Sequence, residues 1–341
     1  MRLASRLPLL LLLLAIAGVA RPARAYVRYS TGGGLPFGWK KSCVWITSYP
    51  TELPLMTRDQ TRDAIAAAVG AWSKQDPTIG ACSYLDLRVQ VAAASEPQPA
   101  SANDGMNVVA FRRDTWCPRP PNCYDPAALA LTTVSARTST GEIVDADIEI
   151  NAVNFSWADV TRNAPTGTEQ DLQNAVTHEA GHLIGLDHTC FLGGGTPPKD
   201  QNGNPIPDCA SAPPDVAETT MFPSANSLDT NKRTLAPDDQ MGACGSYPLA
   251  SDPMICLAPT TPDAGVDAST SVDAGTRTDA GIDAEPPRPD ARFDGPSLGD
   301  GGSTTIMKAG CGCEVSGLTT PAPGVLLAAA IVLLVLRRRR R

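Results

Sequence analysis

Apolar residues recur with two different periods along the first two-thirds of the chain. Ile65, Ala68, Val69 and Trp72 follow helical spacing, which predicts a helix over residues 57–74. Short β-prone runs predict strands over residues 44–48, 84–91, 107–112, 128–136 and 143–150. A strand, a helix and then several more strands predict a mixed, α+β fold.

The last of these runs has two different faces. Apolar residues alternate with Asp145, Asp147 and Glu149 over residues 143–150. This alternation is typical of a strand with one face in water. We therefore expect the three acids to be solvated.

The N-terminus has the pattern of an export signal. Arg2 and Arg6 precede an apolar stretch that runs to Ala20, and Ala23-Arg24-Ala25 follows it. This predicts a secretory signal peptide over residues 1–25 with cleavage after Ala25. An uncleaved anchor is the alternative, but the apolar stretch is short for a membrane span.

The chain contains 10 cysteines, which in an exported protein predict disulfides. Eight of them precede the C-terminal tail: Cys43, Cys82, Cys117, Cys123, Cys190, Cys209, Cys244 and Cys256. Proximity favours the pairs Cys117–Cys123 and Cys190–Cys209, whereas the sequence leaves the other partners open.

Composition changes after residue 256. Residues 257–308 are rich in Asp, Ala, Gly, Pro, Ser and Thr and poor in apolar side chains. Such a segment buries too little surface to repay the entropy of ordering, so we predict a disordered, extended acidic linker. It carries much of the chain's net charge of -8, which we attribute to solvation, and we expect no nucleic-acid partner.

The residues with evident chemistry lie within residues 176–189, VTHEAGHLIGLDHT, which read HExxHxxGxxH. On a helix, His178 and His182 project about 40° apart, so both imidazoles can reach one metal ion. Glu179 lies further round, where it can reach a water on that metal but is no easy ligand. Gly185 can adopt positive φ, end the helix and return His188 as a third ligand.

Three neutral imidazoles around Zn²⁺ leave a fourth position open, where the pKa of a bound water falls to about 7. The chain has only three histidines, and all three lie in this motif. The alternative is a helix whose histidines are ordinary surface or core residues.

The motif resembles the signature of the metzincin zinc endopeptidases. Residues 219–223, TTMFP, are similar to the Met-turn of that family and would place Met221 beneath the metal as an apolar floor, not as a ligand. Thr189, directly after the third histidine, resembles the matrixin branch. The resemblance implies an α+β, metzincin-like zincin fold: a mixed, twisted β-sheet with an active-site helix and a smaller C-terminal subdomain.

The matrixin resemblance extends over about residues 41–248. Pro237 and the acids after it resemble the start of the last matrixin helix. Thr168 is expected to cap the active-site helix, with Asp171 three residues on as a variant of the capping box. In matrixins, related acids hold calcium. Calcium binding is therefore the alternative to a solvated face for the run over residues 143–150. No cysteine-switch motif precedes Cys43.

A second calcium candidate lies in the long loop between His188 and Met221. Its oxygen side chains alternate around a glycine turn and resemble a thrombospondin type 3 repeat; they are Asp200, Asn202, Asn204 and Asp208. Such spacing suits a hard cation. A plain Asn/Gly turn is the alternative.

The C-terminus resembles the sorting tags of myxobacterial surface proteins. Cys311 and Cys313 precede an apolar segment over residues 316–336 and five arginines at residues 337–341. The segment is long enough to span a bilayer, and the arginines keep the end cytoplasmic. The resemblance implies cleavage by a sorting protease and lipid attachment at the cysteines, with a permanent membrane anchor as the alternative.

These patterns predict a signal peptide over residues 1–25, a catalytic domain over 26–256, a linker over 257–308 and a tag over 309–341. We expect a zinc endopeptidase, exported and tethered to the cell surface, that hydrolyses protein or peptide substrates. His178, His182 and His188 would bind the zinc, and Glu179 would act as the general base. The alternative is a catalytically idle, zinc-stabilised adhesion or binding module.

Overall fold

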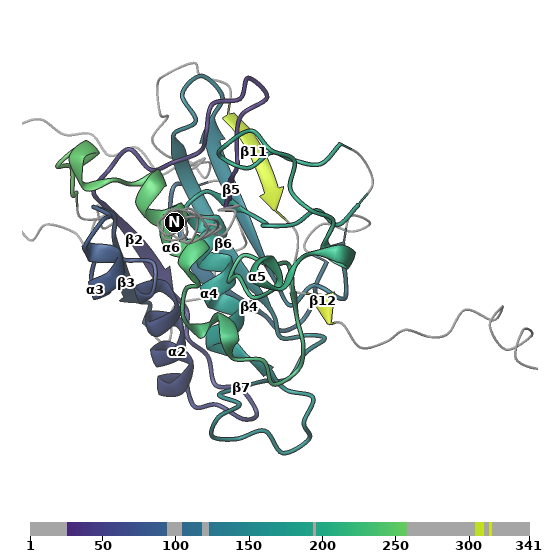
Figure 1. Cartoon of the computed structure of the whole chain (residues 1–341). Coiled ribbons are helices and arrows are strands. Elements are labelled where there is room, and N and C mark those ends of the chain that lie inside the picture. Colours follow the sequence, from purple (N-terminus) through teal and green to yellow (C-terminus); the bar gives the residue numbers. More distant parts are fainter. Residues whose placement is uncertain are drawn as a thin grey trace, which may run out of the picture.

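A mixed β-sheet forms the framework of the protein (Figure 1). The computed structural model describes residues 26–93, 104–117, 123–193 and 196–257, and the backbone of residues 304–309 and 314–315. Five strands come from the first part of the chain: β2 (Cys43–Ser48), β3 (Asp86–Val91), β4 (Val108–Arg112), β5 (Ala130–Arg137) and β6 (Ile143–Asn151). The sixth strand, β11 (Thr304–Ala309), lies outside β5, so the order is β11-β5-β6-β4-β2-β3.

The strand directions make the sheet mixed. Strands β3, β2, β4 and β6 run parallel to one another, whereas β5 is antiparallel to β6 and β11 is antiparallel to β5. Each of the five strand predictions corresponds to an observed strand with ends shifted by no more than two residues. The predicted combination of a mixed sheet and several helices is therefore confirmed.

Two helices cover one face of this sheet. Helix α2 (Arg58–Gly70) contacts β3, and α4 (Leu172–Leu183) contacts β5, β6 and α2. Thr57 starts α2 with a capping box that includes Gln60. The helix ends at Gly70, four residues before the predicted end at residue 74, although Trp72 beyond it is still fully buried.

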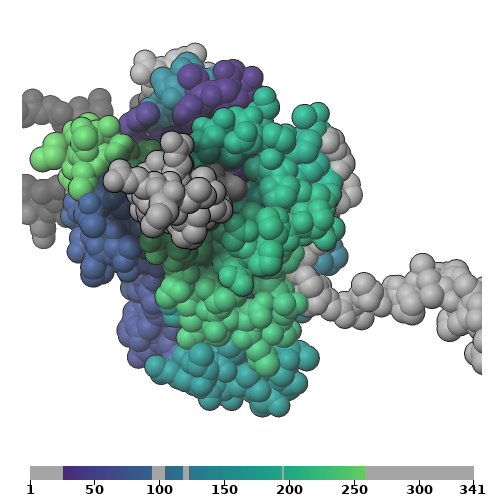
Figure 2. Space-filling view, viewed as in Figure 1, coloured from purple at the N-terminus to yellow at the C-terminus, as the bar shows by residue number. Residues whose placement is uncertain are grey.

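Shorter elements complete the described part of the chain. The strands are β1 (Val27–Arg28), β7 (Trp157–Ala158), β8 (Gln170–Asp171), β9 (Leu186–Asp187), β10 (Ser224–Ala225) and β12 (Glu314–Val315). The helices are α3 (Pro77–Gly80), α5 (Pro214–Ala217), α6 (Pro237–Ser246) and the 3-10 turns η1 (Cys209–Ser211), η2 (Asn231–Arg233) and η3 (Leu249–Ser251). In the space-filling view, the green chain that follows α4 forms much of the surface on the helical side (Figure 2).

The prediction that β6 has one solvated face is wrong. Asp145, Asp147 and Glu149 are all at most 1% exposed. Strand β6 lies inside the sheet between β5 and β4, and its residues are buried on both faces except for the half-buried Val144. Glu149 accepts hydrogen bonds from Arg112 and Tyr124, and Asp147 accepts one from the backbone of β4. Alternation therefore marks two chemically different faces here, one apolar and one polar, and both are buried.

The predicted cap of α4 also differs from the observed one. The N-cap is Asp171, whose carboxylate accepts the backbone N–H of Asn174 at 2.9 Å, and Thr168 lies before β8. Arg233 ion-pairs with the same carboxylate and with Asp159. Asp171 therefore both caps the helix and joins it to η2, which explains why it is preferred over Thr168.

Four disulfides cross-link the domain. Cys117–Cys123 and Cys190–Cys209 confirm the two pairs favoured by proximity. Cys43–Cys256 and Cys82–Cys244 connect residues 213 and 162 positions apart and so join the start of the domain to its end. This density of disulfides points to an extracellular protein.

The predicted membrane-associated segments lie outside the described residues. These are the signal peptide over residues 1–25, Cys311 and Cys313, and the apolar segment over residues 316–336. Most of the acidic linker also lies outside them. Among the helices that the structure describes, none combines the length and apolar character needed to cross a bilayer.

The buried acid Asp145 predicts a pH-dependent loss of stability. Burial, with the charges of Asp147 and Asp104, raises the pKa of Asp145 to about 8. The unfolded chain releases this proton near pH 4, so the folded state binds the extra proton between the two values and stability falls as pH rises through this window. In this window Asp145 lowers the free energy of unfolding of the wild type by up to about 1.4 kcal/mol per pH unit. We expect Asp145→Asn to lack this contribution.

Urea denaturation at pH 5 and pH 8 checks this expectation at constant zinc concentration. The exposed Asp215 offers a control, since Asp215→Asn should keep the wild-type slope. An equal pH slope for Asp145→Asn and wild type would contradict the raised pKa.

Candidate metal centre

The three histidines of the chain converge on one point. His178 and His182 lie one turn apart on α4, which ends at Leu183. Gly185 follows with φ of 92°, a conformation that suits glycine, and its Cβ position would lie 3.1 Å from the carbonyl oxygen of Phe37. The chain turns there into β9, and His188 comes directly after it. Gly185 thus returns the third histidine as the spacing predicts.

The distances between the ring nitrogens fit a single metal ion. The Nε2 atom of His188 lies 3.1 Å from Nε2 of His182 and 3.3 Å from Nε2 of His178. Zinc–nitrogen bonds of about 2.0–2.1 Å at tetrahedral angles place two ligand nitrogens about 3.3 Å apart. Within the described part of the chain, these side chains form the one group of three or more possible His, Cys, Asp or Glu ligands close enough to share an ion.

In two of the rings, the contact made by Nδ1 shows that Nε2 is the nitrogen free to bind a metal. Nδ1 of His178 lies 2.7 Å from the carbonyl oxygen of Thr220, and Nδ1 of His182 lies 2.8 Å from that of Leu186. A carbonyl oxygen only accepts, so both Nδ1 atoms carry the proton and both Nε2 atoms present a lone pair. Tyr29 adds its hydroxyl 2.8 Å from Nδ1 of His182. These contacts also orient the rings.

Burial keeps the imidazoles in the neutral form that binds metal. It lowers the pKa of His178 and His188 well below the usual value and that of His182 to about 4. The positive charge of Lys232 lowers all three pKa values further. Neutral rings need lose no proton when an ion binds.

Glu179 lies beside the three rings on the same helix. It is 1% exposed, and Thr132 of β5 donates a hydrogen bond to its carboxylate at 2.5 Å. The same hydroxyl lies 3.1 Å from the backbone oxygen of Glu179. Burial raises the pKa of Glu179 to about 8, against the opposing effects of Thr132 and Lys232. The carboxyl group is thus set to exchange a proton near neutral pH.

The predicted Met-turn packs under the helix that holds the histidines. Met221 is 1% exposed, and a Cβ on Gly181 would lie 2.2 Å from its sulfur. The turn also supplies the Thr220 carbonyl that orients His178. Asp239 of α6 accepts the backbone N–H groups of Thr220 at 2.7 Å and of Met221 at 3.1 Å.

Several residues that hold this centre in place were not predicted from the sequence. Trp39 and Tyr247 donate to the last carbonyls of the α4 region, at Leu183 and Ile184, over 3.0 Å and 2.6 Å. Trp72 donates to the carbonyl of Thr177 at 2.7 Å. An aromatic residue with a polar atom in an apolar run is a signal of such a role, but it does not reveal the partner.

The predicted calcium residues do not belong to the group of three histidines that could share an ion. Asp200 accepts the backbone N–H groups of Asn202 at 2.8 Å and of Asn204 at 2.9 Å, so it closes a turn around Gly203. Asp208 instead caps η1 through the N–H of Ala210. The turn alternative describes this geometry, and calcium binding stays a prediction.

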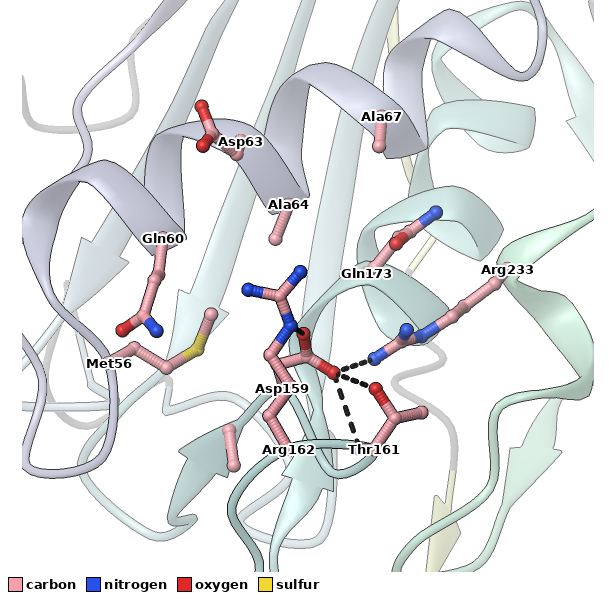
Figure 3. Close-up of a pocket in the computed structure, with 11 residues that line it drawn as sticks. Met56, Gln60, Asp63, Ala64, Ala67, Asp159, Thr161, Arg162, Gln173 and Arg233 are labelled. Carbon is pink, nitrogen blue, oxygen red and sulfur yellow. Dashed lines mark hydrogen bonds and ion pairs between the residues drawn. The ribbon is translucent and has the colours of Figure 1, made fainter.

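Two hollows lie near α4. One, beside His188, is lined by the loop that contains Cys190, Phe191 and Ile206. The other lies between α2 and the start of α4, where Arg162, Thr161 and Arg233 all point to Asp159 (Figure 3). Two acids, Asp63 and Asp159, and two arginines line this second hollow, and no histidine lines it. The hollow beside His188 is therefore the better place for a ligand of the metal centre.

Comparison of the chain with protein-family models and with curated proteins finds no match. The geometry of the centre is therefore the main indication of function.

The convergence of the rings predicts the metal content of variants. His188→Ala removes the ligand whose Nε2 lies within 3.3 Å of both others. We expect about one zinc per chain in wild type and a loss of zinc in the variant, measured by elemental analysis after dialysis. Asp200→Ala, in the separate loop, should keep the zinc. Full occupancy in His188→Ala would place the third ligand elsewhere.

The contact between α4 and the Met-turn predicts a second effect. Gly181→Ala would place a methyl group 2.2 Å from Met221 and 2.8 Å from Trp72. Overpacking costs typically about 1–3 kcal/mol, against up to about 1 kcal/mol gained in helix propensity. We therefore expect a lower free energy of unfolding in chemical denaturation.

Gly70→Ala is the matched control, because nothing lies within 4 Å of a Cβ at the last residue of α2. It should be neutral or slightly stabilising. Equal stability of the two alanine variants would show that Met221 does not press on α4.

Proposed function

We propose that this protein is a zinc-dependent endopeptidase of the metzincin type, similar to the matrixins. The observation that carries the proposal is a set of three neutral, converging imidazoles with a buried carboxyl group beside them. His178, His182 and His188 would hold the zinc, and Glu179 would act on the water. A purely structural metal site has no physical need for that carboxyl group.

The residues of the centre have separate parts in peptide hydrolysis. A bound zinc ion supplies Lewis acidity, which lowers the pKa of water and polarises a carbonyl group. Glu179 accepts a proton from the attacking water as the new C–O bond forms. It then passes the proton to the amide nitrogen as the C–N bond breaks, so one water adds across the peptide bond. Thr132 orients the carboxyl group through its short hydrogen bond.

Glu179 has the properties that a general base requires. Its pKa is raised to about 8 by burial, so the group can accept a proton and release it again near neutral pH. It directly follows His178 on α4 and is buried together with the three imidazoles. Met221 supplies an apolar surface beneath the rings that cannot compete for a proton.

The proposed location is outside the cell, tethered to its surface. The four disulfides support an oxidising compartment. The signal peptide, the membrane span and lipid attachment at Cys311 or Cys313 belong to the same proposal and depend on the sequence pattern. Protein or peptide chains are the proposed substrates.

Glu179→Gln tests the role of the base. The substitution keeps the size of the side chain and an oxygen that can accept from Thr132, but removes the proton-accepting carboxylate. We expect unchanged zinc content and folding, with peptide hydrolysis reduced about 10²- to 10⁴-fold. Hydrolysis of a peptide library, with and without a chelator, provides the measurement.

Glu218→Gln provides the control, since Glu218 is an exposed carboxylate outside the group of possible metal ligands. Hydrolysis within a few-fold of wild type in Glu179→Gln would remove Glu179 from the mechanism. A zinc-loaded wild-type chain that cleaves no peptide would favour the idle binding module instead.

A further inference from the structure

The edge of the sheet nearest the metal centre is paired with a segment from the far end of the chain. β11 runs antiparallel along β5 over six residue pairs, from Thr304 opposite Arg137 to Ala309 opposite Thr132 (Figure 1). Without β11, strand β5 would be the outer strand on this side. An outer strand presents unpaired N–H and C=O groups that accept another extended chain.

The pairing of β11 with β5 ends beside Glu179. Ala309, the last residue of β11, lies opposite Thr132. Thr132 is the residue that donates to the carboxylate of Glu179 at 2.5 Å. Directly opposed residues in an antiparallel pair have Cα atoms about 4.5–5.5 Å apart. The C-terminal segment therefore reaches the side of the sheet from which the general base is held.

A second pairing joins the C-terminal part of the chain to the strand that follows the Met-turn. In β12, Glu314 lies opposite Ser224 and Val315 opposite Ala225, in parallel. Strand β10 begins three residues after Met221, in the chain that supplies the carbonyl contact to His178. Only residues 310–313, which lie outside the described part, separate β11 from β12. The two strands thus pair with β5, which contacts Glu179, and with β10, which follows the turn that contacts His178.

The two edges suit an extended peptide of any sequence. Main-chain hydrogen bonds to a sheet edge provide affinity without specifying side chains, and this is a common way to bind an extended substrate. One edge accepts one strand at a time. A peptide that enters alongside β5 must therefore displace β11.

The covalent connection favours the internal segment over a free peptide. Residues 258–303, which the composition predicts to be an extended linker, join the domain to β11, and a random coil of that length spans roughly 40 Å. An occupant joined covalently to its site competes at an effective concentration that does not depend on the protein concentration. The run TTIMKA is also rich in strand-favouring residues.

We propose that two described strands, β11 (Thr304–Ala309) and β12 (Glu314–Val315), act as a built-in competitive inhibitor that occupies the edges of β5 and β10 and holds the enzyme latent. The pairing itself does not depend on the proposed peptidase function, whereas the effect on hydrolysis does. Removal of this segment, by cleavage of the chain before Thr304 or by its displacement, would open both edges to an extended substrate.

Two adjacent prolines in β11 test the proposal. Successive N–H groups of a strand point to opposite sides, so Ile306→Pro/Met307→Pro removes the one that faces β5 whichever it is. In the full-length chain we expect faster amide hydrogen exchange over residues 130–137. We also expect hydrolysis of a short peptide library to rise by about tenfold, with zinc content unchanged. Ser271→Pro/Val272→Pro in the linker is the control and should match wild type in both measurements.

The two measurements separate the two proposals. Wild-type exchange over residues 130–137 in the β11 variant would overturn the inference, whatever its hydrolytic rate. Faster exchange without hydrolysis in any variant would leave the pairing standing and reject the peptidase. Protection of β5 that falls on dilution of the wild-type chain would assign the occupant to a second copy, and the internal inhibitor would then be wrong.

Discussion

The position of the metal centre depends on the burial of α4. Eleven of its twelve residues are buried, so water cannot satisfy the carbonyl groups at its C-terminal end. Buried donors do so instead: the indole of Trp39 reaches Leu183, and the hydroxyl of Tyr247 reaches Ile184. These donors come from opposite ends of the domain and fix where the helix stops. Because the helix stops there, the glycine turn that follows can bring the third histidine back to the first two.

The same burial determines the chemistry of the side chains. Rings removed from water lose their affinity for protons and remain neutral, whereas the carboxyl group of Glu179 gains affinity for one. Lys232, itself 1% exposed, adds a positive charge. This charge favours the neutral form of the rings, which is the form that binds metal, and the ionised form of Glu179. One low-polarity environment thus provides ligands for a cation and a group poised to move a proton.

The second half of the chain closes the structure around this helix. Asp239 holds the backbone of the Met-turn, and the disulfides at Cys244 and Cys256 join the last part of the domain to the first strands and helices. The segment that forms β11 and β12 continues this arrangement past the end of the domain. This segment has no evident chemistry of its own. Its place on two strand edges nevertheless relates it to access to the metal centre.

The local pattern of the sequence determined much of this protein. The histidine spacing, the glycine turn and two disulfide pairs could each be predicted, because they depend on contacts within a helical turn or a single loop. The place of Met221 was predicted only from the resemblance to a Met-turn. The buried acids of β6, the cap at Asp171 and the support from Trp39, Tyr247 and Asp239 could not. Each depends on which distant segment lies alongside, and a one-dimensional pattern does not distinguish a polar residue facing water from one facing a buried partner. Strand β11 is the clearest case: its residues favour a strand, but only tertiary structure decides which edge that strand joins.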